Sequence, residues 1–168
     1  DGVKQMADYL TQHQSVEAIH IISHGSSGSL QLGTGSLTLN SMTQQYSVEM
    51  AVIKQALTEQ ADILIYGCDF AKGQVGQEAA ILLGELAGAE VAASNNVTGH
   101  INLGGDWDLE VMIGTIETQV AVSEDTQANW KGLLAETWMN ASTGAVIAGP
   151  AGNDWYVGDS ANNAPTAA

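Results

Sequence analysis

Two residues of this chain combine a thiol and an imidazole at matching positions. His24 follows the apolar run AIHIIS, Cys68 follows the apolar run ADILIYG, and each is followed by a polar loop. Because the carboxyl ends of parallel strands lie at one edge of an open α/β sheet, two such strands would bring both side chains to that edge. A thiol facing an imidazole is the arrangement of a cysteine-nucleophile enzyme. The pair therefore predicts a candidate hydrolase.

In that chemistry His24 takes the thiol proton, or holds the thiolate as an ion pair, and Cys68 attacks a carbonyl carbon. The backbone N–H groups of Gly25 and Cys68 are the expected oxyanion donors, and Asp62 or Asp106 would orient His24. The alternative is structural. As the only cysteine, Cys68 forms no internal disulfide and would be a small buried hydrophobe, with His24 bonded to backbone.

Three other motifs are weaker. His20 and His24 have the spacing of a metal pair on a helix, but on a strand they lie ~13 Å apart, so His20 is expected to be a core or interface histidine. The glycines of Gly25–Gly28 precede a hairpin instead of the helix that a phosphate loop needs. The G-x-S-x-G spacing of a serine nucleophile is absent.

Hydrophobic periodicity places the reactive residues in an α/β sandwich with a mainly parallel sheet. We expect the first helix to have no strand before it, so that the sheet lacks its first strand and has a bare edge or a gap. Gly88 would end the last helix. The expected elements are helices 3–13, 48–57 and 77–86, strands 19–23 and 62–67, a hairpin 29–39, and strands 90–94 and 107–113, the last at an edge.

The composition is strongly acidic. The 168 residues carry a formal net charge of -15, with four lysines and no arginine, which disfavours nucleic acid and anionic lipid as partners. No apolar run approaches the ~18 residues of a membrane helix, so no membrane insertion is expected. The acidity and the single cysteine favour an extracellular or cell-surface bacterial protein. A start at Asp1-Gly2 without Met suggests a piece of a longer chain.

The set AIHIISHG, ADILIYGCDFA and GQEAAILLGELAGAEVAAS resembles the caspase–gingipain clan of cysteine peptidases. That resemblance implies a three-layer caspase-like sandwich with His24 and Cys68 as the catalytic dyad. Residues 1–134 are more similar still to the domain of unknown function 4347, through Asp1-Gly2, the two reactive loops, the GGDW run and the closing W-x-G-L-L. This module stands near the N-terminus of large secreted or surface proteins, often adhesins, and has a strand upstream of the DG.

Residues 135–168 are interpreted as a linker. The run AGPAGNDWYVGDSANN resembles one degenerate hemolysin-type calcium repeat, with Asp154 as a weak calcium candidate, and NNAPTAA resembles the lead-in to cadherin-like repeats. The partners implied are downstream repeat domains of the full-length protein. No cofactor is required, and calcium is an option for the tail only.

The leading hypothesis is a Cys–His peptidase that acts on a polypeptide substrate or on its own chain. Without arginine, a pocket for an acidic side chain is disfavoured, so a neutral or basic residue is expected before the cut. Asp69 or another loop acid is a candidate lining residue of such a pocket; capping a turn is the alternative role of Asp69. Two other classes stay open: a non-catalytic structural or adhesion module with the same fold, and a small-molecule acyl-transfer enzyme with a deep pocket.

Overall fold

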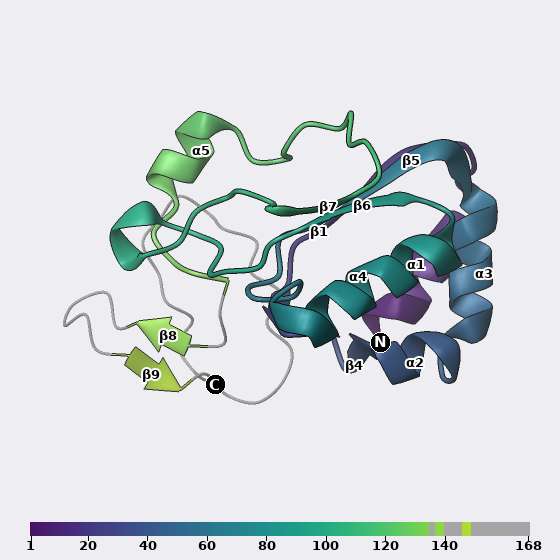
Figure 1. Ribbon diagram of the computed structural model, residues 1–168, viewed down its shortest axis with the longest axis horizontal. Coiled ribbons are helices and arrows are strands. Elements are labelled where there is room, and N and C mark those ends of the chain that lie inside the picture. Colours follow the sequence, from purple (N-terminus) through teal and green to yellow (C-terminus); the bar gives the residue numbers. More distant parts are fainter. Residues whose placement is uncertain (135–136, 140–145, 149–168) are drawn as a thin grey trace.

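A four-stranded sheet forms the centre of the protein in this computed structural model, which describes residues 1–134, 137–139 and 146–148 (Figure 1). The strand order is β1-β5-β6-β7. β1, β5 and β6 are parallel, and β7 pairs antiparallel with β6. The mainly parallel sheet is thereby confirmed. The strands are β1 (Val16–Ile21), β5 (Leu57–Ile65), β6 (Glu90–Ala93) and β7 (Val111–Ile113).

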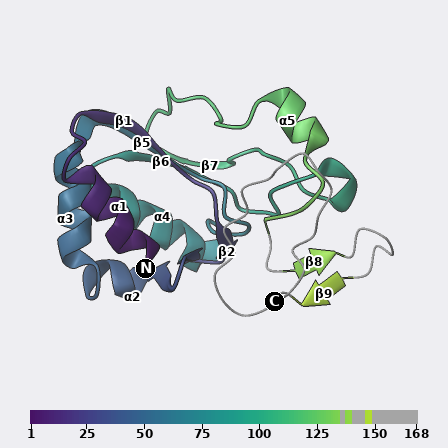
Figure 2. The same cartoon turned by 180° about the vertical axis from the view of Figure 1, so that it is seen from behind.

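Helices cover one face of the sheet, as both views of the ribbon show (Figures 1 and 2). The predicted helices are confirmed, and α4 ends at Gly88, whose φ of 63° is the left-handed conformation that glycine adopts readily. The sequence interpretation omitted the short α2. These helices are α1 (Gly2–Leu10), α2 (Leu39–Thr43), α3 (Ser47–Ala56) and α4 (Gly73–Ala87).

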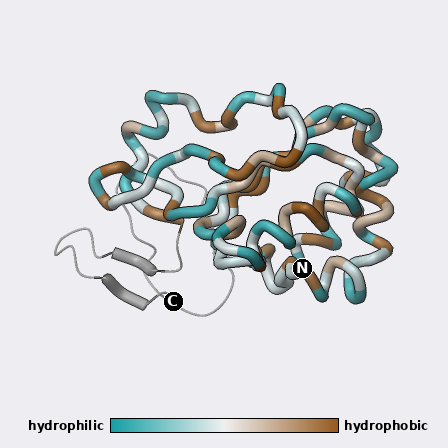
Figure 3. Tube along the Cα trace, viewed as in Figure 1, coloured by the Kyte–Doolittle hydropathy of each residue, from teal (hydrophilic) through white to brown (hydrophobic). Residues whose placement is uncertain are grey.

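The two faces of β5 divide the interior into two clusters. Ile63 and Ile65 pack with the helices, whereas Leu64 and Tyr66 belong to a second cluster with Cys68. This alternation is the period-2 pattern of a strand buried on both faces, and Figure 3 shows hydrophobic residues gathered in the middle of the sheet. Loops and the short α5 (Glu124–Asn129) cover the second face.

A separate antiparallel sheet contains the first reactive residue. It comprises β2 (His24–Ser26), β3 (Ser29–Leu32) and β4 (Gly35–Thr38) in the order β2-β3-β4. The hairpin predicted for residues 29–39 is confirmed, with Leu32 paired to Gly35 across a two-residue turn. His24 was expected in a loop, but it is the first residue of β2 and pairs with Gln31.

The edges of the central sheet differ in part from the prediction. Strand 107–113 was expected at an edge; the observed β7 is at an edge but covers only Val111–Ile113. Trp107 and Leu109, which alternate along the predicted strand and would share one of its faces, are buried in the loop before β7. β1 forms the opposite edge. The first strand, which is predicted from the sequence to be missing, could pair with β1 there, and its absence from the fold stays a prediction.

Beyond residue 134, β8 (Thr137–Met139) and β9 (Val146–Ala148) form an antiparallel pair that the linker interpretation did not include. Asp154 and the proposed calcium repeat lie outside the described residues. Within the described part of the chain, no helix is both long and apolar enough to cross a membrane.

Candidate functional site

The neighbouring parallel strands β1 and β5 position the two reactive residues. Ile21 pairs with Ile65, and His24 and Cys68 each follow three residues later. The two chain segments touch through their backbones at Gly25. A Cβ atom added there would lie 2.8 Å from the Gly67 carbonyl carbon and 2.9 Å from the Cys68 carbonyl oxygen. Only glycine allows so close an approach.

The imidazole of His24 is half-buried and bonded to backbone. Its Nδ1 atom lies 2.8 Å from the carbonyl oxygen of Leu134. A carbonyl only accepts hydrogen bonds, so the neutral ring carries its proton on Nδ1 and its lone pair on Nε2. This tautomer is the one in which Nε2 acts as a base.

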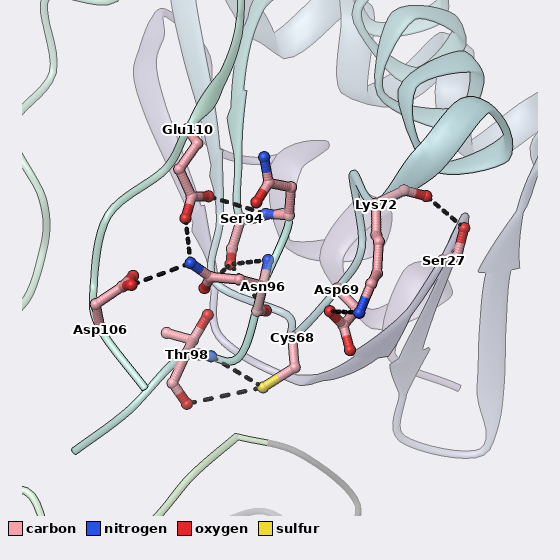
Figure 4. Close-up of polar contacts among 10 residues, drawn as sticks. Ser27, Cys68, Asp69, Lys72, Ser94, Asn96, Thr98, Asp106 and Glu110 are labelled. Atoms are coloured by element: carbon pink, nitrogen blue, oxygen red, sulfur yellow. Dashed lines mark hydrogen bonds and ion pairs between the residues drawn. The ribbon is translucent and has the colours of Figure 1, made fainter. Parts of the chain in front are cut away.

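The Cys68 thiol is buried, with a relative exposure of 1%. The backbone N–H of Thr98 donates to Sγ over 3.2 Å, and Sγ lies 3.7 Å from the Thr98 carbonyl oxygen (Figure 4). Burial raises the pKa of this thiol, the nearby Asp69 charge raises it further, and the Thr98 backbone N–H offsets part of that rise. In this conformation the thiol is protonated at neutral pH and is a poor nucleophile.

A polar network fixes the loop that presents Thr98 to the thiol. Asn96 donates from Nδ2 to the Asp106 carboxylate over 3.0 Å and also to Glu110. The second Glu110 oxygen accepts from the Asn95 backbone N–H at 2.9 Å. Figure 4 shows these carboxylates on one side of the loop and Cys68 on the other. Neither Thr98 nor Asn96 was predicted from the sequence as a contact of this site.

Neither aspartate proposed to orient His24 is bonded to it in the described contacts. Asp106 accepts from Asn96 and from the backbone of Asp108. Asp62 accepts from the backbone N–H groups of two residues in the loop after β7, Glu117 and Thr118. The Leu134 carbonyl occupies the orienting position instead. A backbone group leaves no residue-type signal in a sequence, although Leu134 closes the W-x-G-L-L motif.

Residues 132–134 run beside the loop that contacts Cys68, and we call them the covering segment. Leu134 N–H donates to the Thr98 carbonyl at 2.8 Å, and the His100 N–H donates to the Gly132 carbonyl at 2.9 Å. The Leu134 side chain packs in the same buried cluster as Cys68. The covering segment thus orients His24 and helps to bury the thiol.

Asp69 lies in a tight turn after the cysteine. Its φ of 58° is left-handed, a conformation that Asp tolerates better than most residues. Its Oδ1 pairs with Lys72 Nζ at 2.9 Å, and its N–H donates to the Asn96 carbonyl at 2.6 Å. The carboxylate thus already has a cationic partner, and its role in a substrate pocket stays a prediction.

Residues 1–134 match the family described as Domain of unknown function (DUF4347). The chain belongs to this family. No curated protein and no solved structure matches the chain at a significant level. The family description assigns no activity, so the chemistry of this DUF4347 domain has to be argued from its own residues.

A surface pocket of the DUF4347 domain includes His24 but not Cys68 among its lining residues. It follows the β1 edge from Ile19 to His24 and is completed by Gly2, Met6 and residues 31–33. His20 lies in this pocket, exposed at the surface, with Nδ1 3.1 Å from the Tyr66 hydroxyl. His20 is therefore not a core histidine, and that it is an interface histidine stays a prediction. The neighbouring partner expected for it is present.

Proposed function

We propose that this DUF4347 domain is a caspase-like cysteine peptidase within a large secreted or surface-attached bacterial protein. One observation carries the proposal: His24 and Cys68 follow neighbouring parallel strands, and their loops are in backbone contact at Gly25. The substrate is a polypeptide, either a surface partner or the protein's own chain. The extracellular setting and the downstream repeat domains are parts of the same proposal and rest on composition and resemblance.

In the proposed reaction, His24 Nε2 takes the proton from Cys68 Sγ, and the thiolate attacks the scissile carbonyl carbon. The N–H groups of Gly25 and Cys68 stabilise the oxyanion that forms. His24 returns the proton to the leaving amine, which gives an acyl-enzyme and frees the new N-terminus. Water then attacks the thioester with His24 as base, which releases the carboxylate and restores the thiol.

The buried thiol imposes one condition on this mechanism. Cys68 must become accessible and its pKa must fall before it can attack, so the described conformation corresponds to a resting form. The hydrogen bond from Thr98 to the thiol and the packing of the covering segment in the same cluster are the interactions that must change. Lys131 is exposed and directly precedes this segment, which makes Lys131–Gly132 the first peptide bond to examine for self-cleavage.

The test compares the full chain with Cys68→Ala and His24→Ala. Each protein is incubated alone and with a fluorogenic peptide library that varies the residue before the cut, and products are mapped by mass spectrometry. We expect cleavage in the unsubstituted chain and a loss of at least about 100-fold in both variants. His20→Ala is the matched control, an exposed histidine on β1, and should cleave normally. Cleavage that persists in Cys68→Ala would rule out the proposal.

A second function is favoured by the burial of Cys68. A thiol with 1% exposure and a Thr98 hydrogen bond also suits a structural cysteine. In that case the domain is a non-catalytic structural or adhesion module with the same fold. Absence of cleavage, together with thiol alkylation that is equally slow with and without His24, would favour this function.

A further inference from the structure

We propose that Asp62, Glu90 and Glu117 bind a hard divalent cation, with calcium preferred. One carboxylate oxygen from each lies within 4.8 Å of the other two. Two ligands at a Ca–O distance of 2.3–2.6 Å are at most about 5 Å apart, so one ion can contact all three. The proposal does not depend on the peptidase chemistry.

The sheet register brings two of the ligands together. Asp62 on β5 pairs with Glu90, the first residue of β6, and paired residues of parallel strands project from the same face. The third ligand comes from the loop after β7. The backbone N–H groups of Glu117 and Thr118 donate to Asp62 Oδ2 at 3.2 and 2.9 Å, which fixes this loop against the aspartate.

The other oxygen of Asp62 is the observation that points to a ligand. Asp62 has 1% exposure, and its Oδ1 has no hydrogen-bond partner among the described residues. A buried carboxylate oxygen without a partner carries a large desolvation penalty. A bound cation would supply the missing interaction, and it would do so beside two further carboxylates.

Within the described part of the chain, no ion pair neutralises this group. The only ion pair in the described part of the chain joins Lys72 and Asp69, on the loop after β5. Two more acidic residues, Glu17 and Glu59, line a surface pocket together with Asp62 and Glu117. Carboxylates gathered around one pocket concentrate cations there. The three ligands and the pocket around them therefore both favour a positively charged ligand.

Glu90 is held in place by a glycine. A Cβ atom added at Gly114 would lie 2.7 Å from Cγ, Cδ and Oε1 of Glu90. The Glu90 side chain therefore packs directly over Gly114, where any other residue would displace it. Asp62 is fixed by its two backbone donors, so two of the three ligands are preorganised, and preorganisation lowers the entropic cost of binding.

The donor set selects the class of ion. All three ligands are carboxylates, which suit calcium and magnesium, whereas zinc sites are built mainly from His and Cys. Glu117 is exposed, so waters can complete the six to eight oxygens that calcium takes. Magnesium requires a tighter octahedron at 2.0–2.1 Å. For an open site with three carboxylates we expect a calcium Kd of about 0.1 to 1 mM, the range of extracellular modules.

The test is calorimetric titration of the chelator-treated full chain with calcium chloride up to about 10 mM, with thermal unfolding followed in parallel. We expect one calcium per chain at this site and a rise in Tm. Glu90→Gln and Glu117→Gln should each weaken binding at least about tenfold, because affinity depends on the ligand charge count. Asp62→Asn should abolish binding without lowering the Tm of the metal-free protein, since it removes a buried charge. If that variant fails to fold, the two glutamate variants decide.

Two controls separate this site from its surroundings. Glu59→Gln removes a carboxylate from the same pocket but not from the ligand group, and should bind calcium normally. Asp154→Asn changes the tail and should leave this binding intact. The proposal would be overturned if both glutamate variants bound calcium as well as the unsubstituted chain, or if binding disappeared in Asp154→Asn. It would also be overturned if the unsubstituted chain bound no calcium at about 10 mM. Tighter binding of magnesium than of calcium would overturn the preference for calcium.

Discussion

Nδ1 of His24 lies 2.8 Å from the carbonyl oxygen of Leu134, a residue 110 positions later in the chain. The end of the DUF4347 match therefore orients an imidazole near its beginning. Leu134 also donates its N–H to the Thr98 carbonyl and packs in the cluster that contains Cys68. The geometry of the candidate site thus depends on the covering segment as much as on the central sheet.

Leu134→Ala is expected to loosen this arrangement. The Leu134 side chain is buried in the cluster that contains Cys68, and its truncation should cost about 2 to 4 kcal/mol of unfolding free energy. The cavity should also increase the rate at which iodoacetamide alkylates Cys68. Urea unfolding and mass-spectrometric labelling measure the two effects.

The matched control for Leu134→Ala is Ile101→Ala, because the Ile101 side chain has 78% exposure. Its unfolding free energy should change by less than about 0.5 kcal/mol, with Cys68 labelling unaltered. Equal losses of stability in the two variants would show that the covering segment contributes no specific packing.

Alkylation of Cys68 should be slow in the folded protein and should increase only at alkaline pH. Burial raises the pKa of the thiol, so its thiolate fraction at pH 8 is below that of an ordinary cysteine with a pKa of ~8.5. The measurement is the iodoacetamide rate from pH 5 to 10, with the protein unfolded in urea as reference. Rapid labelling near pH 6 that is lost in His24→Ala would instead indicate an activated thiolate in solution.

The same pKa shift predicts that the folded state loses stability as the pH rises. Between the ordinary pKa and the raised folded pKa, the native thiol keeps a proton that the unfolded thiol releases. The native state then binds more protons, so the unfolding free energy falls with increasing pH. The contribution of the Cys68 thiol to the unfolding free energy is fully present only below the ordinary pKa and is lost as the pH rises through the folded pKa. Burial also raises the pKa of Tyr66, which acts in the same direction at higher pH.

Thermal unfolding from pH 7 to 11 tests this dependence. Cys68→Ala should show a smaller loss of Tm above pH 8 than the unsubstituted chain, and the remaining loss should come from the tyrosines. Parallel Tm curves for the two proteins would mean that the Cys68 thiol does not contribute to alkaline unfolding.

Much of the fold follows from local sequence pattern. Apolar runs such as ADILI predict strands buried on both faces, and helical spacing predicts α1, α3 and α4, because both signals lie within a few residues. The short β2 at His24 was missed because strands of three residues carry little periodicity. Trp107 and Leu109 alternate like strand residues, yet they are buried by tertiary contacts in a loop.

The candidate site is predictable only in part. His24 and Cys68 are visible because their residue types are reactive and because both end an apolar run. The contacts that determine their state come from the Thr98 amide and the Leu134 carbonyl, which any residue type provides. The burial of Cys68 likewise results from chain segments distant in sequence, so no local pattern reports it.

Gly25→Ala tests the contact between the two reactive loops. An added methyl group would meet the backbone of Gly67 and Cys68 at 2.8 to 2.9 Å, closer than Cβ atoms normally approach other atoms. Since backbone cannot rotate away as a side chain can, we expect a loss of about 1 to 3 kcal/mol and a displacement of His24 relative to Cys68. Urea unfolding gives the first quantity, and faster Cys68 alkylation reports the second.

Gly132→Ala is the control for this substitution, because the nearest atom to its added Cβ is Nε1 of Trp130 at 3.8 Å, an ordinary contact. It lies in the covering segment yet should leave the unfolding free energy nearly unchanged. If Gly25→Ala is as stable as this control, the β1 and β5 loops are not in rigid backbone contact. His24 and Cys68 would then lack the fixed geometry on which the peptidase proposal rests, whatever the state of the thiol.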